Sequence, residues 1–193
     1  KKLSKLITIR DHDNFFLADE VVNNIMEMDK NGLPLDIRIG EGVYLGPGVK
    51  LNAGVNIEKN ARLLGNIILG KGVFIGDSVY MNTNPDQTIS IGDKTEILQG
   101  NIIKGNVTIG NDCRIETPVR LTGSDEWPLK IGNNVRIKGT TYIFGSIVEN
   151  GARIENSVLS KKKVKFLKDK QGKPVKVGYI FPEPQGRECL EYL

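Results

Sequence analysis

Residues 39–57 read IGEGVYLGPGVKLNAGVNI, and every sixth residue of this stretch is Ile or Leu. The spacing continues to residue 143 with two interruptions, and a second series follows four residues behind the first. A long helix repeats every 3.6 residues and a simple strand every two, so a period of six belongs to a repeated structural unit. Repeats of this length are typical of a parallel β-helix. The first series is Ile39, Leu45, Leu51, Ile57, Leu63, Leu69, Ile75, Met81, Ile91, Ile97, Ile103, Ile109, Ile115, Leu121, Ile131, Ile137 and Ile143, and the second is Val43, Val49, Val55, Ala61, Ile67, Val73, Val79, Val107, Cys113, Val119 and Val135.

The residue after each repeat aliphatic supports this interpretation. A chain that turns a corner every six residues requires small residues there, or residues that tolerate a positive φ. Three hexapeptides would form one triangular coil, with the repeat aliphatics filling the interior of a prism. Glycine follows the aliphatic residue at positions 40, 46, 70, 76, 92, 110 and 132.

Residues 39–57 and residues 109–121, IGNDCRIETPVRL, resemble the hexapeptide-repeat transferase superfamily. The resemblance covers roughly residues 37–160 and implies a left-handed β-helix, commonly assembled as a homotrimer. We therefore expect an all-β fold, a left-handed parallel β-helix of about six triangular coils.

The chain divides into three parts. Residues 1–36 precede the repeat, with a short strand expected at Leu6–Ile9 and a short N-terminal helix at Leu17–Asp29. Residues 37–160 hold the hexapeptide-repeat β-helix. Residues 161–193 are expected to form a Lys-rich C-terminal β-hairpin extension around residues 170–173, whose apolar face caps the last coil, followed by a tail.

Composition agrees with one aliphatic-rich domain. Of the 193 residues, 39% are hydrophobic but only 6% aromatic, which suits a prism filled by aliphatic layers. No apolar run approaches the roughly 20 residues of a membrane helix, and no signal peptide pattern is present, so no membrane partner is expected. Cys113 lies in the inward series and Cys189 near the end of the chain, so we expect no disulfide and a cytoplasmic protein.

The two interruptions of the repeat have the same size and position. The step from Met81 to Ile91 and the step from Leu121 to Ile131 are each four residues longer than the repeat. Both loops should project from one corner of the prism, with one coil between them, where solenoid proteins commonly build binding sites. Alternatively, they are tolerated corner loops and Trp127 packs a trimer contact. The ligand-binding candidates here are Asn82, Asn84 and Trp127.

The usual catalytic residues of the resembled superfamily are missing. Its CoA-dependent acyltransferases use a coil histidine as general base, whereas the single histidine here, His12, precedes the repeat. The γ-class carbonic anhydrases bind zinc through three histidines, so that activity and a metal site are not expected. The remaining catalytic candidates are His12, which is otherwise a surface or capping residue, and three loop carboxylates, Asp86, Asp125 and Glu126. The carboxylates would need burial to act as bases and otherwise are solvated turn residues.

Residues 143–160, IFGSIVENGARIENSVLS, are similar to the final coils of sugar-1-phosphate nucleotidyltransferases. The matching residues are Ser146, Ile147, Ala152, Ile154, Asn156, Ser157 and Val158. In that family the β-helix assembles and regulates the enzyme while a separate α/β domain performs the chemistry. The resemblance implies a module of this kind, which agrees with the missing coil histidine.

Residues 161–176 carry eight lysines and one acid, Asp169. One interpretation is a solvated edge that resists aggregation. The other is an anion site for a CoA or nucleotide phosphate, with Lys161, Lys162 and Lys163 as ligand-binding candidates. Nucleic acid is not an expected partner, because arginines and interleaved aromatics are absent from this lysine face.

Two functional hypotheses follow. The preferred one is a trimeric assembly and regulatory β-helix module related to sugar-1-phosphate nucleotidyltransferases, with a nucleotide sugar as ligand. The alternative is a CoA-dependent acyltransferase that acts on a sugar or amine at a cleft between subunits, with acetyl-CoA as cofactor and a non-standard base.

Overall fold

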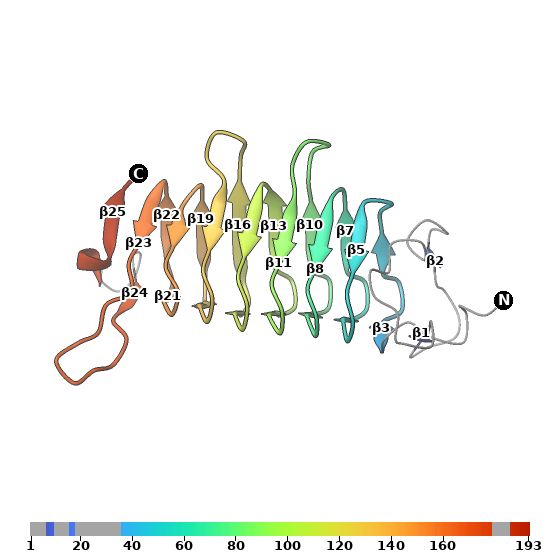
Figure 1. Cartoon of the computed structure of the whole chain (residues 1–193), viewed down its shortest axis with the longest axis horizontal. Coiled ribbons are helices and arrows are strands. Elements are labelled where there is room, and N and C mark those ends of the chain that lie inside the picture. The colour runs from blue at the N-terminus through green and yellow to red at the C-terminus, as the bar shows by residue number, and fades with distance from the viewer. Residues whose placement is uncertain (1–6, 10–15, 18–35, 179–185) are drawn as a thin grey trace.

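The computed structural model describes residues 7–9, 16–17, 36–178 and 186–193. Its strands form three sheets that are parallel almost throughout. The coils stack on one another along one long axis, and each sheet runs along that axis (Figure 1). Within the described residues, seven groups of three strands, from β3–β5 to β21–β23, form seven coils, one more than expected. The predicted all-β parallel β-helix is confirmed.

Each sheet takes one strand from every coil. The first sheet is β1 (Ile7–Ile9), β3 (Ile37–Ile39), β6 (Asn56–Ile57), β9 (Phe74–Ile75), β12 (Glu96–Ile97), β15 (Arg114–Ile115), β18 (Arg136–Lys138), β21 (Arg153–Glu155) and β24 (Lys176–Gly178). The second is β2 (Phe16–Leu17), β4 (Tyr44–Leu45), β7 (Arg62–Leu64), β10 (Tyr80–Asn82), β13 (Ile102–Gly105), β16 (Val119–Gly123), β19 (Thr141–Phe144) and β22 (Val158–Ser160). The third is β5 (Val49–Leu51), β8 (Ile67–Leu69), β11 (Ile89–Ile91), β14 (Val107–Ile109), β17 (Leu129–Ile131), β20 (Ile147–Val148), β23 (Lys162–Val164) and β25 (Leu190–Tyr192).

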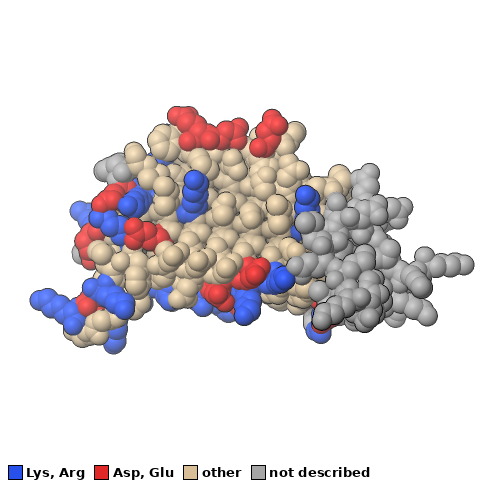
Figure 2. Space-filling view, in the orientation of Figure 1, with Lys and Arg blue, Asp and Glu red and all other residues tan. Residues whose placement is uncertain are grey.

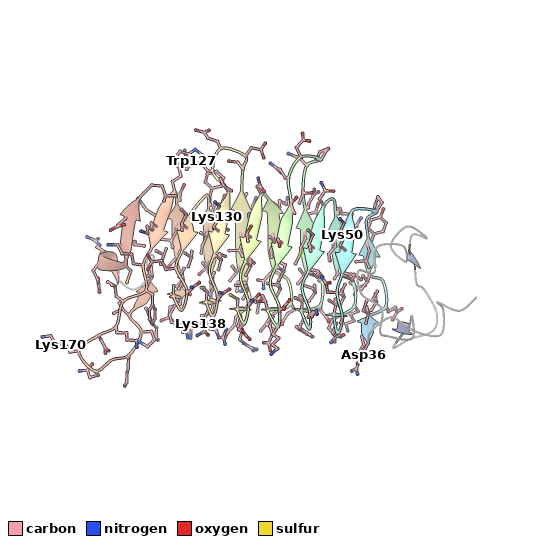
Figure 3. All side chains as sticks on the ribbon, in the orientation of Figure 1. Asp36, Lys50, Trp127, Lys130, Lys138 and Lys170 are labelled. Atoms are coloured by element: carbon pink, nitrogen blue, oxygen red, sulfur yellow. The ribbon has the colours of Figure 1, made fainter. Side chains whose placement is uncertain are left out.

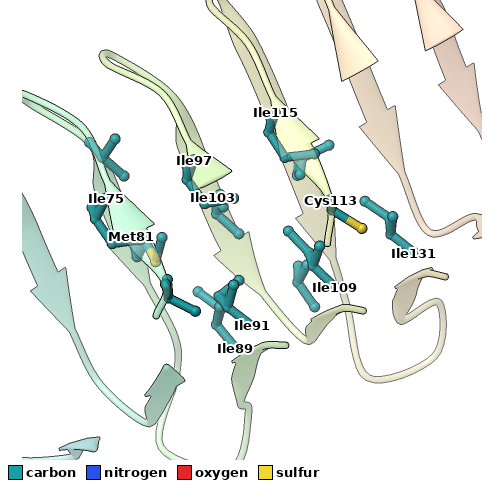
Figure 4. Packing of buried hydrophobic residues seen from close by; sticks show 14 of the residues in the cluster. Ile75, Met81, Ile89, Ile91, Ile97, Ile103, Ile109, Cys113, Ile115 and Ile131 are labelled. Carbon is teal, nitrogen blue, oxygen red and sulfur yellow. The ribbon is translucent and has the colours of Figure 1, made fainter. Parts of the chain in front are cut away.

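Both aliphatic series point into the prism, as predicted. Every member of the two series is at most 3% exposed. Strand register stacks equivalent residues on one another, so Ile75, Ile97 and Ile115 form one row of the core (Figure 4). The row continues because each strand pairs with its equivalent in the next coil, which places identical backbone positions one above the other.

The second series lapses where the core contains polar side chains. Thr95 and Asn101 take its places in the fourth coil and are completely buried. The Asn101 amide donates to the carbonyl oxygens of Leu98 (2.9 Å) and Ile115 (3.1 Å), and its Oδ1 accepts from the Val119 N–H at 2.8 Å. Because these polar atoms are paired, their burial does not carry the cost of an unsatisfied group.

The corner glycines are required by close approach of the coils. Gly92 does not adopt a positive φ, but a Cβ there would lie 2.5 Å from the carbonyl carbon of Gly110 in the next coil. The left-handed residue comes two positions later, at Lys94 (φ 55°). Asp93, between them, donates its N–H to Asn111 Oδ1 at 2.8 Å, which ties the same corner of successive coils together.

The repeat shortens toward the C-terminal end. The inward residues Ile154, Leu159 and Val164 are spaced by five rather than six, and all three are buried. The last of them belongs to β23, which pairs in parallel with β20 and extends the third sheet beyond residue 160. A shorter repeat explains why this coil does not stand out in the sequence.

The C-terminal residues close the end of the β-helix. Lys168 and Pro174 form an antiparallel bridge around the expected turn, whose tip carries Lys170 (Figure 3). The two arms of this turn continue into different sheets, since β23 extends the third sheet and β24 the first. After a short 3-10 helix, η2 (Arg187–Cys189), β25 pairs antiparallel with β23 and covers its edge.

At the N-terminal end, β1 agrees with the expected short strand and pairs in parallel with β3. Leu17 belongs to β2, and the rest of the expected helix at Leu17–Asp29 lies outside the described residues. Cys113 and Cys189 are both buried and free. No helix of the described ranges has the length and apolarity needed to cross a membrane.

We predict that Gly92→Ala lowers the free energy of unfolding by about 2 kcal/mol, because the new methyl group forces two coils apart. Chemical denaturation measures the change. The matched control is Gly178→Ala, where the nearest described atom to a new Cβ, Glu155 O, lies 3.6 Å away. Equal stability of the two variants would show that the close approach at Gly92 is not a constraint on the fold.

Candidate functional site

The two insertions form loops that project from the same corner of the prism, as predicted. One joins β10 to β11 and the other joins β16 to β17, and both leave the same side of the molecule (Figure 1). The coil that contains β13 and β14 runs between them. Each loop connects the second sheet to the third.

A hydrogen bond joins the two loops across the intervening coil. Gln87, which is 7% exposed, donates from Nε2 to Asp125 Oδ1 at 2.9 Å. Its Oε1 accepts from the Asn84 N–H at 3.2 Å, and its own N–H donates to the Asn84 carbonyl at 3.0 Å. In the second loop, Ser124 and Trp127 exchange two hydrogen bonds, of 2.9 and 3.0 Å, so both loops are fixed turns.

Glycine allows the coils to pass closely beneath this bridge. Gly105 has a φ of 78°, and a Cβ there would overlap the carbonyl oxygen of Gly123. A Cβ at Gly123 would in turn overlap the carbonyl oxygen of Asn106. The missing side chains at these two positions allow the backbones of neighbouring coils to lie in contact, and both glycines line a hollow between the loops.

This hollow, which we call the loop groove, has a volume of about 330 Å³. Asn82 donates from Nδ2 to the Tyr80 hydroxyl at 2.9 Å, and Lys104 Nζ lies 5.2 Å from the centre of the Tyr80 ring. Thr122 Oγ1 is buried and has no hydrogen-bond partner among the described residues. The groove is lined by Asn82, Asn84, Gln87, Lys104, Gly105, Thr122 and Gly123.

The predicted carboxylate candidates lie outside the lining of the groove. Asp86, Asp125 and Glu126 are all exposed, and acidic side chains gather on the tips of the two loops (Figure 2). Asp125 also accepts the hydrogen bond from Gln87. A carboxylate acts as a base near neutral pH when burial disfavours its charged form, and these three side chains are not buried. The fourth catalytic candidate, His12, lies outside the described residues.

Trp127 and Lys161 form a separate pair. Trp127 is in the second loop (Figure 3) and packs so closely on the next coil that a Cβ at Gly145 would lie 2.6 Å from its own Cβ. Lys161 Nζ lies 4.2 Å from the ring centre, in cation–π geometry. The Trp127 Nε1 atom is buried without a partner in the described part of the chain. This ring therefore holds the second loop on the coil below.

Lys162 and Lys163 belong to β23 and lie apart from the loop groove. Lys163 Nζ is 3.7 Å from carboxylate oxygens of both Glu149 and Glu191. A hydrogen bond from Lys165, together with the charges of Lys165 and Lys163, lowers the pKa of the Glu191 carboxyl. Acidic partners thus compensate part of the lysine-rich surface. Of the predicted ligand-binding residues, the structure brings only Asn82 and Asn84 together in the groove.

Sequence reasoning missed most of the lining, although a signal was present. Lys104 and Thr122 pair in register with Asn82 on successive strands of the second sheet. All three residues directly follow an inward aliphatic residue, so the repeat alignment places them in one column. Gln87 carries no such signal, because its position depends on the conformation of the first loop.

No group of three His, Cys, Asp or Glu side chains gathers in the described residues in a way that could hold a metal ion. No protein-family model matches the chain, and no curated protein matches its sequence.

We predict that Gln87→Ala uncouples the loops and accelerates amide hydrogen exchange in residues 124–128 by about tenfold, as expected for a hydrogen bond worth about 1.4 kcal/mol. Mass spectrometry of the peptide that contains these residues measures the effect. The control is Asp86→Ala in the same loop, since Asp86 is exposed and forms no hydrogen bond or ion pair with a described residue. Similar exchange in both variants would mean that the bridge does not order the second loop.

Proposed function

We propose that this chain is a hexapeptide-repeat assembly and binding module. It oligomerises as a trimer and binds the sugar part of a sugar nucleotide in the loop groove, without a chemical step of its own. The observation that carries the proposal is a groove lined by amide and hydroxyl side chains beside a single lysine, in which Thr122 Oγ1 is buried without a partner among the described residues.

The chemistry of the lining favours a hydroxyl-rich ligand. Amide and hydroxyl groups both donate and accept hydrogen bonds, as sugar hydroxyls do. A buried hydroxyl with no protein partner gains about 1–3 kcal/mol when a ligand satisfies it. The backbone of Gly105 and Gly123 forms part of the lining and adds no charged group to it.

The same lining weighs against the acyltransferase alternative. That activity requires a base that removes a proton from the acyl acceptor. Among the residues that line the groove, Lys104 is the only ionisable one, and its ammonium lies against the Tyr80 ring. The loop carboxylates are exposed at the tips. A role in assembly or regulation, rather than acyl transfer, is the function that this geometry supports best.

Exposed apolar side chains support oligomerisation. Tyr44 and Val158 on the second sheet are 46% and 50% exposed, and Ile147 on the third is 38% exposed. A cyclic trimer brings two different surfaces of each subunit into contact, so apolar residues on two neighbouring sheets suit it.

Binding is tested by thermal-shift and calorimetric screens with UDP-glucose, ADP-glucose, sugar 1-phosphates, CoA and acetyl-CoA. We predict that a sugar nucleotide binds and that Thr122→Val weakens binding about tenfold, since one hydrogen bond is lost. Thr108→Val, the same change at an exposed position of the third sheet, is the control. Hydrolysis or transfer of the acetyl group of acetyl-CoA, or binding that Thr122→Val leaves intact, would contradict the proposal.

Assembly is tested by sedimentation velocity. We predict a particle of three times the 21.3 kDa chain mass, and its dissociation in Val158→Asp, which places a charge in an apolar contact. Gln171→Asp makes the same change of charge at an exposed turn and should remain trimeric. A monomer in the unmodified protein, or equal behaviour of the two variants, would refute this contact face.

A further inference from the structure

Basic side chains form a column on the outer face of the first sheet. Arg114, Arg136, Arg153 and Lys176 pair in register on four consecutive strands, from β15 to β24. Neighbouring strands lie about 4.8 Å apart, so the guanidinium groups of successive coils are adjacent. Lys138, on β18, lies along the edge of the molecule opposite the two loops (Figure 3).

Backbone carbonyls, rather than carboxylates, hold the two central arginines. Arg136 donates from Nη1 to the Asp112 carbonyl at 2.6 Å. Arg153 donates from Nη1 to the carbonyls of Asn134 at 2.7 Å and Gly151 at 2.6 Å. Asp112 and Asn134 are equivalent left-handed corner residues, with φ of 54° and 53°, so the same anchor recurs in successive coils. Neutral acceptors fix each guanidinium in place without compensating its charge.

The anchoring leaves one edge of each guanidinium available. All hydrogen bonds that Arg136 and Arg153 make within the described residues use Nη1. Nε and Nη2 together form the side edge, a pair of parallel N–H donors that matches two oxygens of a carboxylate or phosphate. Neither arginine forms an ion pair with a carboxylate of the described residues.

Two adjacent uncompensated cations repel each other. Burial, and then the charge of Arg136, lower the pKa of the Arg153 guanidinium. The acids nearby do not relieve this repulsion, because Glu155 is shared by Lys138 at 3.2 Å and Lys176 at 3.3 Å. Burial would raise the pKa of the Glu155 carboxyl, but hydrogen bonds and charge from these two lysines outweigh it and lower that pKa.

These residues line a hollow of about 230 Å³, which we call the arginine groove. Its cationic residues outnumber its acids, and its lining is Arg114, Glu116, Arg136, Lys138, Arg153, Ile154, Glu155 and Lys176. At one end, Arg114 is paired with Glu96 and with Glu116. Glu96 takes the next place in the column, which ends the run of positive charge. The groove therefore suits a short anion rather than a long polyanion.

We propose that the arginine groove binds the diphosphate group of a small molecule, with one phosphoryl group on the side edge of Arg136 and the other on that of Arg153. The side edges of Arg136 and Arg153 are two forked pairs of N–H donors that lie one coil apart. Two such forks match two linked phosphoryl groups better than they match a single phosphate. Lys138 and Lys176 flank the forks and add positive charge at the rim. The site is on a different face from the loop groove and does not depend on the function proposed for that groove.

Isothermal titration calorimetry of the full chain with sodium pyrophosphate, sodium phosphate and ADP tests the proposal. We expect pyrophosphate to bind at least about tenfold more tightly than phosphate, since only pyrophosphate engages both forks. Equal affinities for pyrophosphate and ADP would assign recognition to the phosphates alone, and tighter ADP binding would add a contact to the nucleoside. Both results support a diphosphate site.

Three variants locate the binding. Arg136→Gln should weaken pyrophosphate binding about tenfold, and so should Arg153→Lys, which keeps the charge but lacks the fork. The control Arg120→Gln removes the same charge from the second sheet, where Arg120 lies 5.4 Å from the Tyr142 ring centre, and should retain binding. Melting temperatures verify that each variant is folded.

Three results would overturn the proposal. The first is the absence of saturable pyrophosphate binding up to about 1 mM. The second is unchanged affinity in folded Arg136→Gln and Arg153→Lys. The third is an equal loss of affinity in Arg120→Gln, which would show that pyrophosphate affinity depends only on the net charge of the protein.

Discussion

Each coil of this β-helix depends on the next for its backbone hydrogen bonds and for the burial of its aliphatic side chains. The coils must therefore approach one another to strand-pairing distance, and glycine is required at those corners where a Cβ would overlap the neighbouring coil, as at Gly92 and Gly110. The same register that satisfies the backbone stacks equivalent side chains in columns. Inside the prism, this stacking produces aliphatic rows. On the outer surface, the same stacking aligns polar or charged groups that are distant in the sequence.

The sequence period predicts which residues face inward, and it also predicts the common corner of the two insertions. It does not predict contacts made by side chains whose positions depend on loop conformation, and for this reason Gln87 and its bond to Asp125 were not anticipated. Asn101 was missed because a fully hydrogen-bonded polar side chain can occupy an inward position that the pattern reserves for aliphatics. Corner glycines were attributed partly to positive φ, whereas Gly92 is required by the neighbouring coil.

The arginine column illustrates the same limit on the outer surface. Arg114, Arg136 and Arg153 are unequally spaced in the sequence, because the second insertion lengthens one interval and the shortened repeat reduces the next. No fixed period connects them, although each lies between two inward residues, the second of which is isoleucine. They become neighbours only through strand pairing, which restores the register that the insertions obscure. Sites of this kind are visible only after the coils have been aligned.

The two grooves differ in the charge of their lining and therefore suit different chemical groups. Asp86, Asp125 and Glu126 are exposed on the two loops and lie outside the lining of the loop groove, whose amide and hydroxyl groups suit the neutral, hydroxyl-rich sugar part of the proposed ligand. On the first sheet, the excess of cations attracts phosphate groups. A solenoid has no deep interior in which to build a pocket, so selectivity must come from shallow grooves that differ in charge. Arg136 and Arg153 carry adjacent positive charges that no carboxylate of the described residues pairs with, and an anion bound between them would relieve their repulsion.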